Sequence, residues 1–391
     1  MFLEFAWNAW EKRKVSDYLC ESRIPGSNGL KAKKLTVKLW GKGVVPKNET
    51  YSGSIKTKYY VRSANQLIYG KLDFLHAAFG IVPQSLDGWE STIDSPAFDV
   101  NTSIGNAAFL LALFLRPNFY LREGIRANGS RKAKRIHEDT FLSMSISAPQ
   151  RKEQDQIAVV LDKTELLIAA TQDKIDAFEQ IKKAFLQHLF DQSWRFGEYS
   201  ELWTSHLLGE ITSKVTEKNT ENLYHETFTN SAKYGIVEQQ SFFDKLISNE
   251  ANLTNYYVVR ENDFVYNPRI SNLAPVGPVR RNKLNRTGVM SPLYYVFKAT
   301  NAAYPMFLEY FFKGESWYRF MYLNGDTGAR SDRFAIKDKV FEQMPVKLPE
   351  ESEQKKIGAL LQNLETVMNQ TQERLQKIRT IKDSLLKSLF V

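Results

Sequence analysis

The chain has 391 residues, which is enough for two or three domains, and its hydrophobic content of 43% with 13% aromatic residues excludes a disordered chain. The single cysteine, Cys20, excludes a disulfide framework and a cysteine-rich zinc site, and it indicates a reducing compartment. The net charge of +9 suggests a polyanionic partner.

No segment indicates secretion or membrane insertion. The N-terminal stretch MFLEFAWNAWEKRK has its charges after its apolar residues, the reverse of a signal peptide. The longest apolar run, AAFLLALFL at 107–115, is too short to span a bilayer and predicts a buried helix. We therefore expect a cytoplasmic protein.

Residues 1–148 are predicted to form a first globular domain. β-type runs bounded by Gly, Pro, Asn or Asp occupy 35–45, 66–70, 79–83 and 98–100, and an apolar helix follows at about 105–116. This pattern predicts an α+β fold around a twisted sheet.

Basic residues gather at 31–47 and 126–135 of this first domain. Gly, Asn, Ser and Thr are interleaved with them, as in loops that follow phosphates and reach base edges. A single lysine is usually solvated surface, so the clustering is what favours nucleic-acid contact. The candidate DNA-binding residues here are Lys31, Lys33, Lys34, Lys38, Lys42, Lys56, Lys58, Lys71, Arg126, Arg131, Lys132, Lys134 and Arg135.

Residues 149–192 are predicted to form one long helix. Pro149 at its entrance and Glu153 in its first turn are typical of a helix N-terminus. With Thr164 between Leu161 and Ile168, its stripe positions alternate steps of four and three, which is the seam of a coiled coil. The seam residues are Ile157, Leu161, Ile168, Thr171, Ile175 and Phe178.

Residues 193–348 are predicted to form a second globular domain of the same kind. Its β-type runs occupy 255–259, 263–267 and 293–297, and an apolar helix follows at 301–312. Its candidate DNA-binding residues are Arg269, Arg280, Arg281, Lys283, Arg286, Arg330 and Arg333.

Residues 349–391 repeat the first long helix. Aligned without gaps over 42 positions, 149–190 and 349–390 share 13 identical residues, where chance gives roughly two or three. The seam recurs in the same register as Ile357, Leu361, Leu364, Met368, Thr371, Leu375 and Ile378. Either stripe alone could be the core face of an amphipathic helix, but two matched stripes favour a mutual pair.

Fainter matches extend the repeat upstream. NAAF at 106–109 corresponds to NAAY at 301–304, and YYV at 59–61 corresponds to YYV at 256–258. Trp10 and Trp203 stand near the starts of the two halves. The order is the same in both halves, with offsets between 193 and 200, so the chain is predicted to be an internal duplication.

Motifs for catalysis are missing from the sequence. It has no P-loop, no GxGxxG after a strand, no HExxH, and no acidic-Pro-Pro-aromatic tetrapeptide of the adenine methyltransferases. SLDGWEST at 85–92 contains two carboxylates, but a polar turn explains it better. We therefore expect no catalytic residues, no metal and no cofactor in this chain.

The sequence resembles the specificity subunits of type I restriction–modification systems. The resemblance covers nearly the whole chain and rests on the paired PxxxEQxxI…L helices, the entries with Trp10 and Trp203, and 69–100. It also rests on ANGSRK and DTGARSDR, the Gly/Arg runs before each helix.

This resemblance implies an α+β fold of two tandem globular α/β-type target recognition domains, separated by two long antiparallel coiled-coil helices with a pseudo-twofold internal duplication. Each domain would read one half of a bipartite, asymmetric site on double-stranded DNA. The helices would dock two methyltransferase subunits that bring S-adenosylmethionine and modify adenine, and a restriction/translocase subunit is a further expected partner.

Two further expectations follow from that arrangement. Thr171 and Thr371 hold equivalent seam positions near the helix centres, so we expect them to face one another. SNLAPVGPVRRNKLNRTGVM at 271–290 replaces the corresponding stretch of the first half, so the two domains should read different sequences.

Two alternatives stay open at this point. The chain could be a basic coiled-coil adaptor that binds proteins without sequence-specific DNA recognition, or the specificity module of a modification-only system. A steep fall of DNA affinity with salt would separate the adaptor from a DNA reader.

Overall fold

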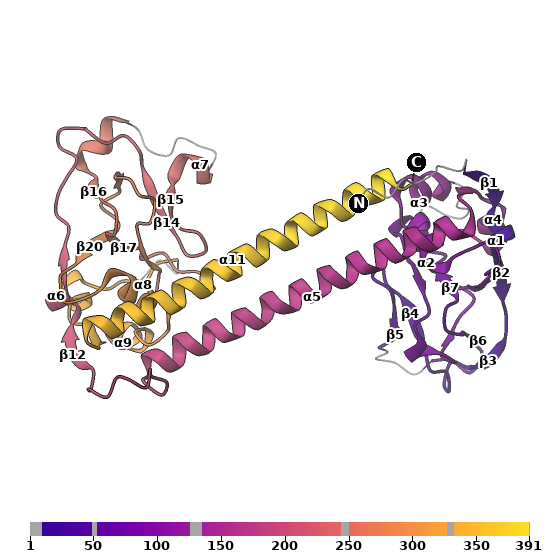
Figure 1. The fold of residues 1–391 in the computed structure, drawn as a ribbon, viewed down its shortest axis with the longest axis horizontal. Coiled ribbons are helices and arrows are strands. Elements are labelled where there is room, and N and C mark those ends of the chain that lie inside the picture. Colours follow the sequence, from indigo (N-terminus) through magenta and orange to yellow (C-terminus); the bar gives the residue numbers. More distant parts are fainter. Residues whose placement is uncertain (1–9, 49–52, 126–134, 244–249, 327–331, 391) are drawn as a thin grey trace. The chain divides into compact units, whose positions relative to one another are not determined.

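The computed structural model describes residues 10–48, 53–125, 135–243, 250–326 and 332–390, with helix and strand mixed throughout (Figure 1). The chain divides into two compact units, Met1–Ala169 with Lys377–Val391, and Ala170–Gln376. The long helices expected at 149–192 and 349–391 are α5 (Arg151–Phe190) and α11 (Glu351–Ser388). The units divide within these two helices, whereas the sequence assigns each helix a segment of its own.

A four-stranded antiparallel sheet in the order β2-β10-β7-β8 forms the centre of the first unit. Smaller sheets β1-β11, β3-β6-β9 and β4-β5 accompany it. The strands are β1 (Glu11–Lys14), β2 (Leu19–Ser22), β3 (Pro25–Asn28), β4 (Leu35–Val37), β5 (Val44–Pro46), β6 (Lys58–Val61), β7 (Leu67–Tyr69), β8 (Phe79–Ile81), β9 (Glu90–Ser91), β10 (Ala97–Val100) and β11 (Ser145–Ala148). The helices are α1 (Val15–Tyr18), α2 (Ala107–Phe114), α3 (Pro117–Gly124) and α4 (Glu138–Ser143), with 3-10 turns at Phe74–His76 and Gln84–Leu86.

The second unit is built around a sheet in the order β13-β20-β17-β18, with pairs β12-β21, β14-β15 and β16-β19 beside it. Its strands are β12 (Thr204–Leu207), β13 (Thr212–Lys214), β14 (Phe228–Ser231), β15 (Gly235–Glu238), β16 (Tyr257–Val259), β17 (Phe264–Tyr266), β18 (Val279–Arg281), β19 (Gly288–Met290), β20 (Tyr295–Ala299) and β21 (Pro345–Leu348). Its helices are α6 (Leu208–Ile211), α7 (Gln239–Phe243), α8 (Pro305–Lys313), α9 (Tyr318–Asn324) and α10 (Asp338–Phe341), with a 3-10 turn at Glu250–Asn255.

The two central sheets have the same topology, strand for strand. The equivalent strands β7 and β17 begin at Leu67 and Phe264, and β8 and β18 begin at Phe79 and Val279, which are offsets of 197 and 200 residues. Even a backbone detail recurs: Asn65 and Asn262, in the turns before β7 and β17, have φ of 68° and 70°. Asparagine tolerates this left-handed conformation better than most residues. The internal repeat seen in the sequence is thus also a repeat of local structure.

In each unit, the hydrophobic core includes a phenylalanine from the C-terminal end of a long helix. In the first unit Phe390, which follows α11, stacks on Phe109 at 5.2 Å between ring centroids, and Trp10 meets it edge-on at 6.0 Å. In the second unit Phe190 at the end of α5 lies 5.1 Å from Phe307, which Trp203 also contacts. The same phenylalanine of the repeat therefore fills the same place in both units.

The helices run antiparallel in each unit, and one ion pair recurs. Lys182 lies 2.7 Å from Glu365 in the second unit, and Lys382 pairs with Glu165 in the first. Lys182 and Lys382 are equivalent in the repeat, as are Glu365 and Glu165. Both ion pairs define the same antiparallel register, in which the numbers of any two facing residues add up to about 547. Leu189 and Phe190 accordingly share a core with Ile357, as an antiparallel pair requires.

This register corrects the expectation that Thr171 and Thr371 face one another. It brings Thr171 opposite Leu375 and Thr371 opposite Ile175, because the centre of the register falls between residues 173 and 174 rather than at 171. Both threonines are buried, at 7% and 8% exposure. The offset arises because seam layers in an antiparallel pair join unlike positions of the heptad.

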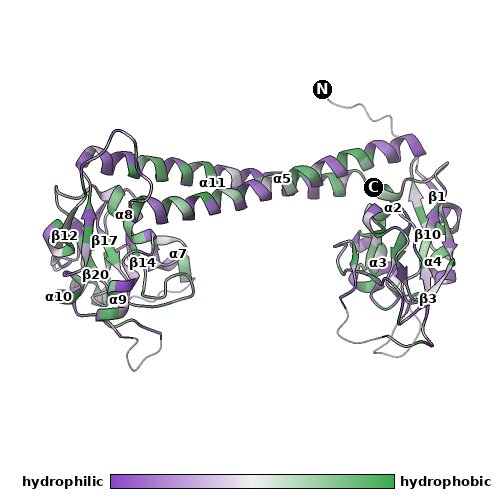
Figure 2. Ribbon diagram, turned by 90° about the horizontal axis from the view of Figure 1, so that it is seen from below, coloured by the Kyte–Doolittle hydropathy of each residue, from purple (hydrophilic) through white to green (hydrophobic). Residues whose placement is uncertain are grey.

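Every predicted seam residue is buried or half-buried. Apolar and polar stretches alternate along both helices in Figure 2, as they do when one face of a helix is covered. The buried members are Ile157, Leu161, Thr171, Ile175, Ile357, Leu361, Met368, Thr371, Leu375 and Ile378, and the half-buried ones are Ile168, Phe178 and Leu364.

Candidate nucleic-acid interface

The predicted lysines of the first unit lie mainly on its small peripheral sheets. Lys38 and Lys42 are in the loop of the β4–β5 hairpin, Lys31 and Lys33 precede it, and Lys34 lies next to β4 and is half-buried. Lys58 is the first residue of β6 and Lys56 lies in the turn before it, and both are exposed. Within the described residues, the side chains of Lys33, Lys38 and Lys42 have no carboxylate partner. Their charge is therefore available to an anion.

An exposed tryptophan stands at the tip of the same hairpin. Trp40 has φ of 58°, an unfavourable conformation for a bulky residue, and its side chain is 55% exposed. Its backbone is held there because Trp40 N donates to His76 O at 2.8 Å and Gly41 N donates to Ala77 O at 2.9 Å. An exposed aromatic ring thus extends from a fixed backbone in the loop that also carries Lys38 and Lys42, a combination suited to nucleic acid. Sequence reasoning missed it, although LWGKG, with two glycines around a lysine, was a usable signal.

Lys71 differs from the other predicted lysines. Its side chain is 4% exposed, and its ammonium lies 2.7 Å from Glu138. Burial works to raise the pKa of Glu138, but the hydrogen bond from Lys71, a backbone hydrogen bond and the charges of Lys71 and Arg23 together outweigh it and hold that pKa below its usual value. Lys71 neutralises an internal carboxylate, so its charge is not available to a nucleic acid.

The basic run before α4 is described only at its end. Arg135 lies 3.4 Å from Asp94, and Arg126, Arg131, Lys132 and Lys134 lie outside the described residues, as does Arg330 of the second unit.

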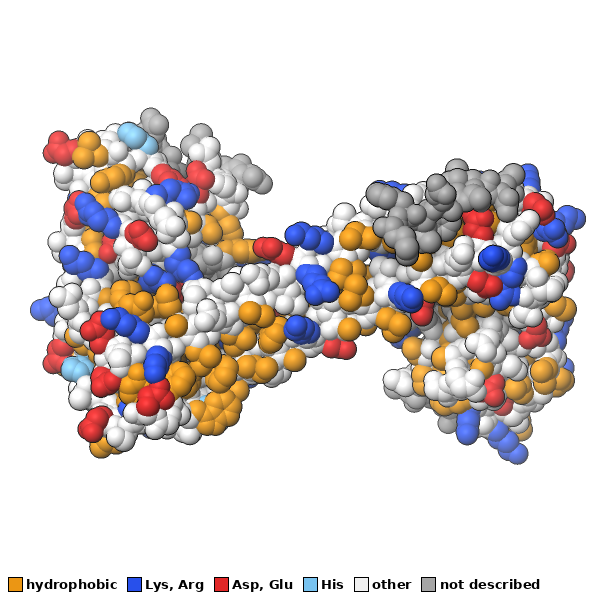
Figure 3. Space-filling model, viewed as in Figure 1, with side chains coloured by type: hydrophobic (Ala, Val, Ile, Leu, Met, Phe, Trp, Pro, Cys, Tyr) orange, Lys and Arg blue, Asp and Glu red, His pale blue; other side chains and the backbone are white. Residues whose placement is uncertain are grey.

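Most predicted arginines of the second unit are occupied by internal partners. Arg286 contacts Glu226 at 2.5 Å, and Arg281 contacts Glu309 at 2.6 Å. Arg280 donates to the carbonyls of Val279 and Ala232 at 2.9 and 2.8 Å. On the face seen in Figure 3, basic side chains of this unit often lie beside acidic ones. A paired guanidinium attracts a phosphate weakly, because the carboxylate cancels its charge.

Two largely buried carboxylates, Glu309 of α8 and Glu365 of α11, each form ion pairs with two or more basic side chains. Glu309 is contacted by Arg281, Lys283 and Lys313, the last two at 3.3 and 2.8 Å. Glu365 of α11 accepts from Lys182 and Lys313 at 2.7 and 2.8 Å. Burial opposes ionisation of Glu365, but Lys313 and Lys182 outweigh it and lower its pKa to about 2. This network fastens β18 and α8 to the helix pair, which is a structural use of Arg281 and Lys283.

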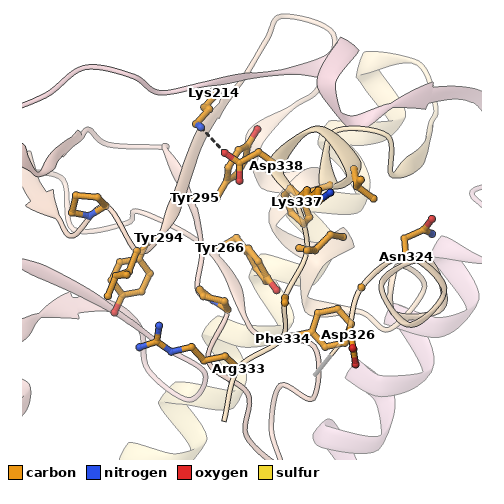
Figure 4. A pocket seen from close by; sticks show the side chains of 18 of the residues that line it. Lys214, Tyr266, Tyr294, Tyr295, Asn324, Asp326, Arg333, Phe334, Lys337 and Asp338 are labelled. Atoms are coloured by element: carbon orange, nitrogen blue, oxygen red, sulfur yellow. Dashed lines mark hydrogen bonds and ion pairs between the residues drawn. The ribbon is translucent and has the colours of Figure 1, made fainter. Parts of the chain in front are cut away.

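Two adjoining cavities, of about 820 and 790 Å³, open in the second unit. They share Pro268, Leu293, Tyr294 and Arg333 as a common wall. Figure 4 shows the first cavity with tyrosine side chains on one side and the Arg333 side chain reaching beside Tyr294. Lys214 at its edge is already paired with Asp338 at 2.6 Å, and Arg269, in the second cavity, lies 3.9 Å from Asp332. Among the predicted residues, the structure therefore brings Arg269 and Arg333 together at one aromatic cleft.

Other kinds of site are missing from the part of the chain that the structure describes. No three His, Cys, Asp or Glu residues there are grouped as metal ligands. No described helix combines the length and the apolar character that crossing a membrane requires.

No protein-family model and no curated protein matches the chain. Solved structures do. The specificity (S) subunit of a type I restriction–modification system from M. genitalium matches with a TM-score of 0.57 at 13% identity, over 100% of this chain and 98% of that one. A chain from a structural study of assembly and conformational transition in the type I restriction–modification system matches with a TM-score of 0.51 at 15% identity, over 98% and 97%.

The chain has the fold of a type I specificity subunit. The HsdS subunit from Thermoanaerobacter tengcongensis is also similar, with a TM-score of 0.49 at 15% identity over 100% and 99% of the two chains. The specificity-subunit fold extends over the full described length, so the resemblance noted in the sequence and the fold agree.

Proposed function

We propose that this chain is the DNA-reading specificity subunit of a type I restriction–modification complex. Residues 1–148 and 193–348 are the two target recognition domains, and 149–192 and 349–391 are the spacer helices. The chain binds a bipartite, asymmetric site on double-stranded DNA and has no catalytic role of its own. It acts in the cytoplasm, where its single, exposed cysteine stays reduced.

The main support for this proposal is that the two units share one sheet topology but have different surfaces. The two central sheets match strand for strand, but their units present different surfaces. The first presents Trp40 with Lys33, Lys38 and Lys42, which have no carboxylate partner among the described residues, and the second presents an aromatic cleft with Arg333. A duplicated scaffold with two different binding faces is what an asymmetric, two-part DNA site demands.

The helices also support two copies of one partner. Leu167 and Val367 are equivalent in the repeat and directly precede the seam residues Ile168 and Met368. Ile181 and Ile381 are also equivalent and directly precede Lys182 and Lys382, the lysines of the recurring ion pair. These four apolar side chains are 41–56% exposed. The common register brings Leu167 opposite Ile381 in the first unit and Ile181 opposite Val367 in the second. We propose that these two apolar patches dock two methyltransferase subunits, which carry S-adenosylmethionine; a restriction/translocase subunit joins in a complete complex.

Deleting the gene and mapping modified adenines in the source genome tests the proposal. We expect one bipartite, asymmetric motif to lose its methylation and to regain it when the full chain is supplied with its methyltransferase. A methylation map that does not change on deletion contradicts the proposal.

The strongest alternative is a basic adaptor that binds only proteins. For a DNA reader with six or more phosphate contacts, affinity for duplex DNA should fall by roughly 10³-fold or more between 50 and 200 mM salt. A shallow salt dependence with intact protein partners favours the adaptor. A modification-only complex differs from a restriction–modification complex only in lacking a restriction subunit. Purifying the complex and determining whether it contains that subunit distinguishes the two.

A further inference from the structure

We infer that Arg333, with Tyr294 beside it, reads a guanine base in the half of the DNA site bound by the second unit. This inference rests on the proposed function and assigns one specificity-determining residue to it. The observation behind it is the wall shared by the two cavities, where Arg333 and Tyr294 face both.

Arg333 has a charge that the described residues leave uncompensated. Within the described residues, no carboxylate lies in ion-pair range of its guanidinium, whereas Arg260, Arg281 and Arg286 of the same unit are paired with glutamates. An arginine in a half-buried position loses hydration, so it gains most from a partner that offers strong acceptors. A ligand with closely spaced acceptor atoms therefore suits this cleft.

The backbone around Arg333 is fixed on both sides. Ile270 N donates to Asp332 O at 3.0 Å, and Phe334 N donates to Pro268 O at 2.8 Å. The Phe334 ring is 2% exposed in the core of the unit. The backbone that carries the Arg333 side chain is therefore fixed in position, which limits where its guanidinium can reach.

Tyr294 is held as firmly. Its hydroxyl lies 3.2 Å from Thr229 Oγ1, its amide donates to Ser291 O at 3.1 Å, and the next residue, Tyr295, is in the core. A fixed aromatic hydroxyl beside a guanidinium fork restricts the directions from which a ligand can approach. A guanidinium fork matches the O6 and N7 acceptors of guanine in the major groove, the commonest specific contact between arginine and a base. The same fork can also hold a phosphate through two bonds, and the test below separates the two targets.

The test is selection of bound sequences from a randomised duplex library by the full chain with its methyltransferase partner. We expect the wild type to select a guanine in the second half-site, and Arg333→Gln and Arg333→Lys each to lower the preference for it by roughly 5- to 150-fold, because a good bidentate contact discriminates by that much. The rest of the motif should persist. Arg260→Gln is the matched control, since its guanidinium is already paired with Glu217, and it should leave the motif unchanged.

Three results would overturn the inference. One is a second half-site without guanine. Another is an unchanged guanine preference in Arg333→Lys, which keeps the charge and loses the fork. The third is an equal loss of affinity for all sequences in Arg333→Gln, which would assign Arg333 to a phosphate. If the wild type selects no bipartite motif at all, the proposed function fails instead, so the two failures are distinguishable.

Discussion

At the scale of single residues, one buried position of the repeat is neutral in the first unit and ionisable in the second. Gln66 and Asp263 are equivalent and both buried, each just after the left-handed asparagine of its turn. Gln66 is neutral and donates to Asp99 at 2.8 Å. Asp263 accepts from Arg260 N at 2.7 Å, but burial, which disfavours the charged form, raises its pKa to about 6.

The sign of this shift predicts a pH dependence of stability. A carboxyl whose pKa is raised by folding binds its proton more tightly in the folded state, so its ionisation destabilises the fold as pH rises from the unfolded value through about 6. Asp263→Asn removes that charge and keeps an oxygen for Arg260 N. We expect it to raise the free energy of unfolding by roughly 1–2 kcal/mol at pH 8 and by much less at pH 4.

Urea denaturation at the two pH values measures this effect. Glu261→Gln is the matched control, because Glu261 is exposed in the same turn and should change stability little at either pH. A variant Asp263→Asn that is less stable than the wild type at pH 8 contradicts the account and makes the charge itself a structural requirement.

At the scale of the elements, each long helix uses one face to pair with the other helix, and a second, exposed face is the proposed docking site. Seam residues and the ion pairs Glu165–Lys382 and Lys182–Glu365 hold the pair together. The patches proposed for docking lie just outside the seam and remain exposed; apolar side chains along the helices are visible at the surface in Figure 3. Exposed apolar side chains repeated at equivalent positions indicate an interaction site rather than chance.

We predict that Ile381→Asp reduces the bound methyltransferase from two subunits to one. A charge in a docking patch leaves a buried, unpaired carboxylate in the complex, which costs far more than an exposed one. Val367→Asp should do the same through the second unit, and the double variant should bind none. Native mass spectrometry of the purified complex gives the stoichiometry.

Val159→Asp is the control for these variants. Val159 is 51% exposed, comparable with Ile381 at 56%, but lies two residues beyond a seam position on the outer face of α5. It should retain two methyltransferase subunits. Full occupancy in the double variant, with helix content unchanged, would exclude the patches as docking sites.

At the scale of the whole molecule, each globular part depends on a helix end of the repeat. The first unit needs Phe390 against Phe109 and Trp10, and Phe390 comes from the far end of the chain. Phe190, its equivalent, performs the same task on Phe307. Because Leu189 and Phe190 match Leu389 and Phe390 in sequence, a second copy of residues 1–190 can supply what the C-terminal segment supplies.

The fragment 1–190 is therefore predicted to form a homodimer that reads a symmetric DNA site. Twofold symmetry of a homodimer is mirrored in its DNA, so the site should be an inverted repeat of the first half-site. Light scattering measures the assembly, and selection from a randomised duplex library measures the site. Phe190→Ala should weaken the dimer, since it removes the ring that closes the partner's core. A folded fragment that stays monomeric at tens of micromolar, or one that selects the asymmetric site, contradicts this prediction.

The sequence by itself determined the parts of this protein that repeat. A 200-residue offset between PxxxEQxxI helices, a seam with steps of four and three, and recurring short β-type runs predicted two long helices and two mixed globular parts. These features are local, because periodicity and turn residues act within a few positions of one another. The seam residues were identifiable for the same reason.

Only the tertiary structure decided which cations are free. Lys71, Arg281 and Arg286 look like Lys42 or Arg333 in the sequence, but their carboxylate partners Glu138, Glu309 and Glu226 stand 28–67 residues away and are brought close by folding. The register of the helix pair could not be predicted from the sequence either. Sliding one helix along the other by a few residues preserves the seam pattern, whereas the ion pairs between the helices select one alignment. Charge can be counted along a chain, but whether a charge is available to DNA depends on what lies next to it in space.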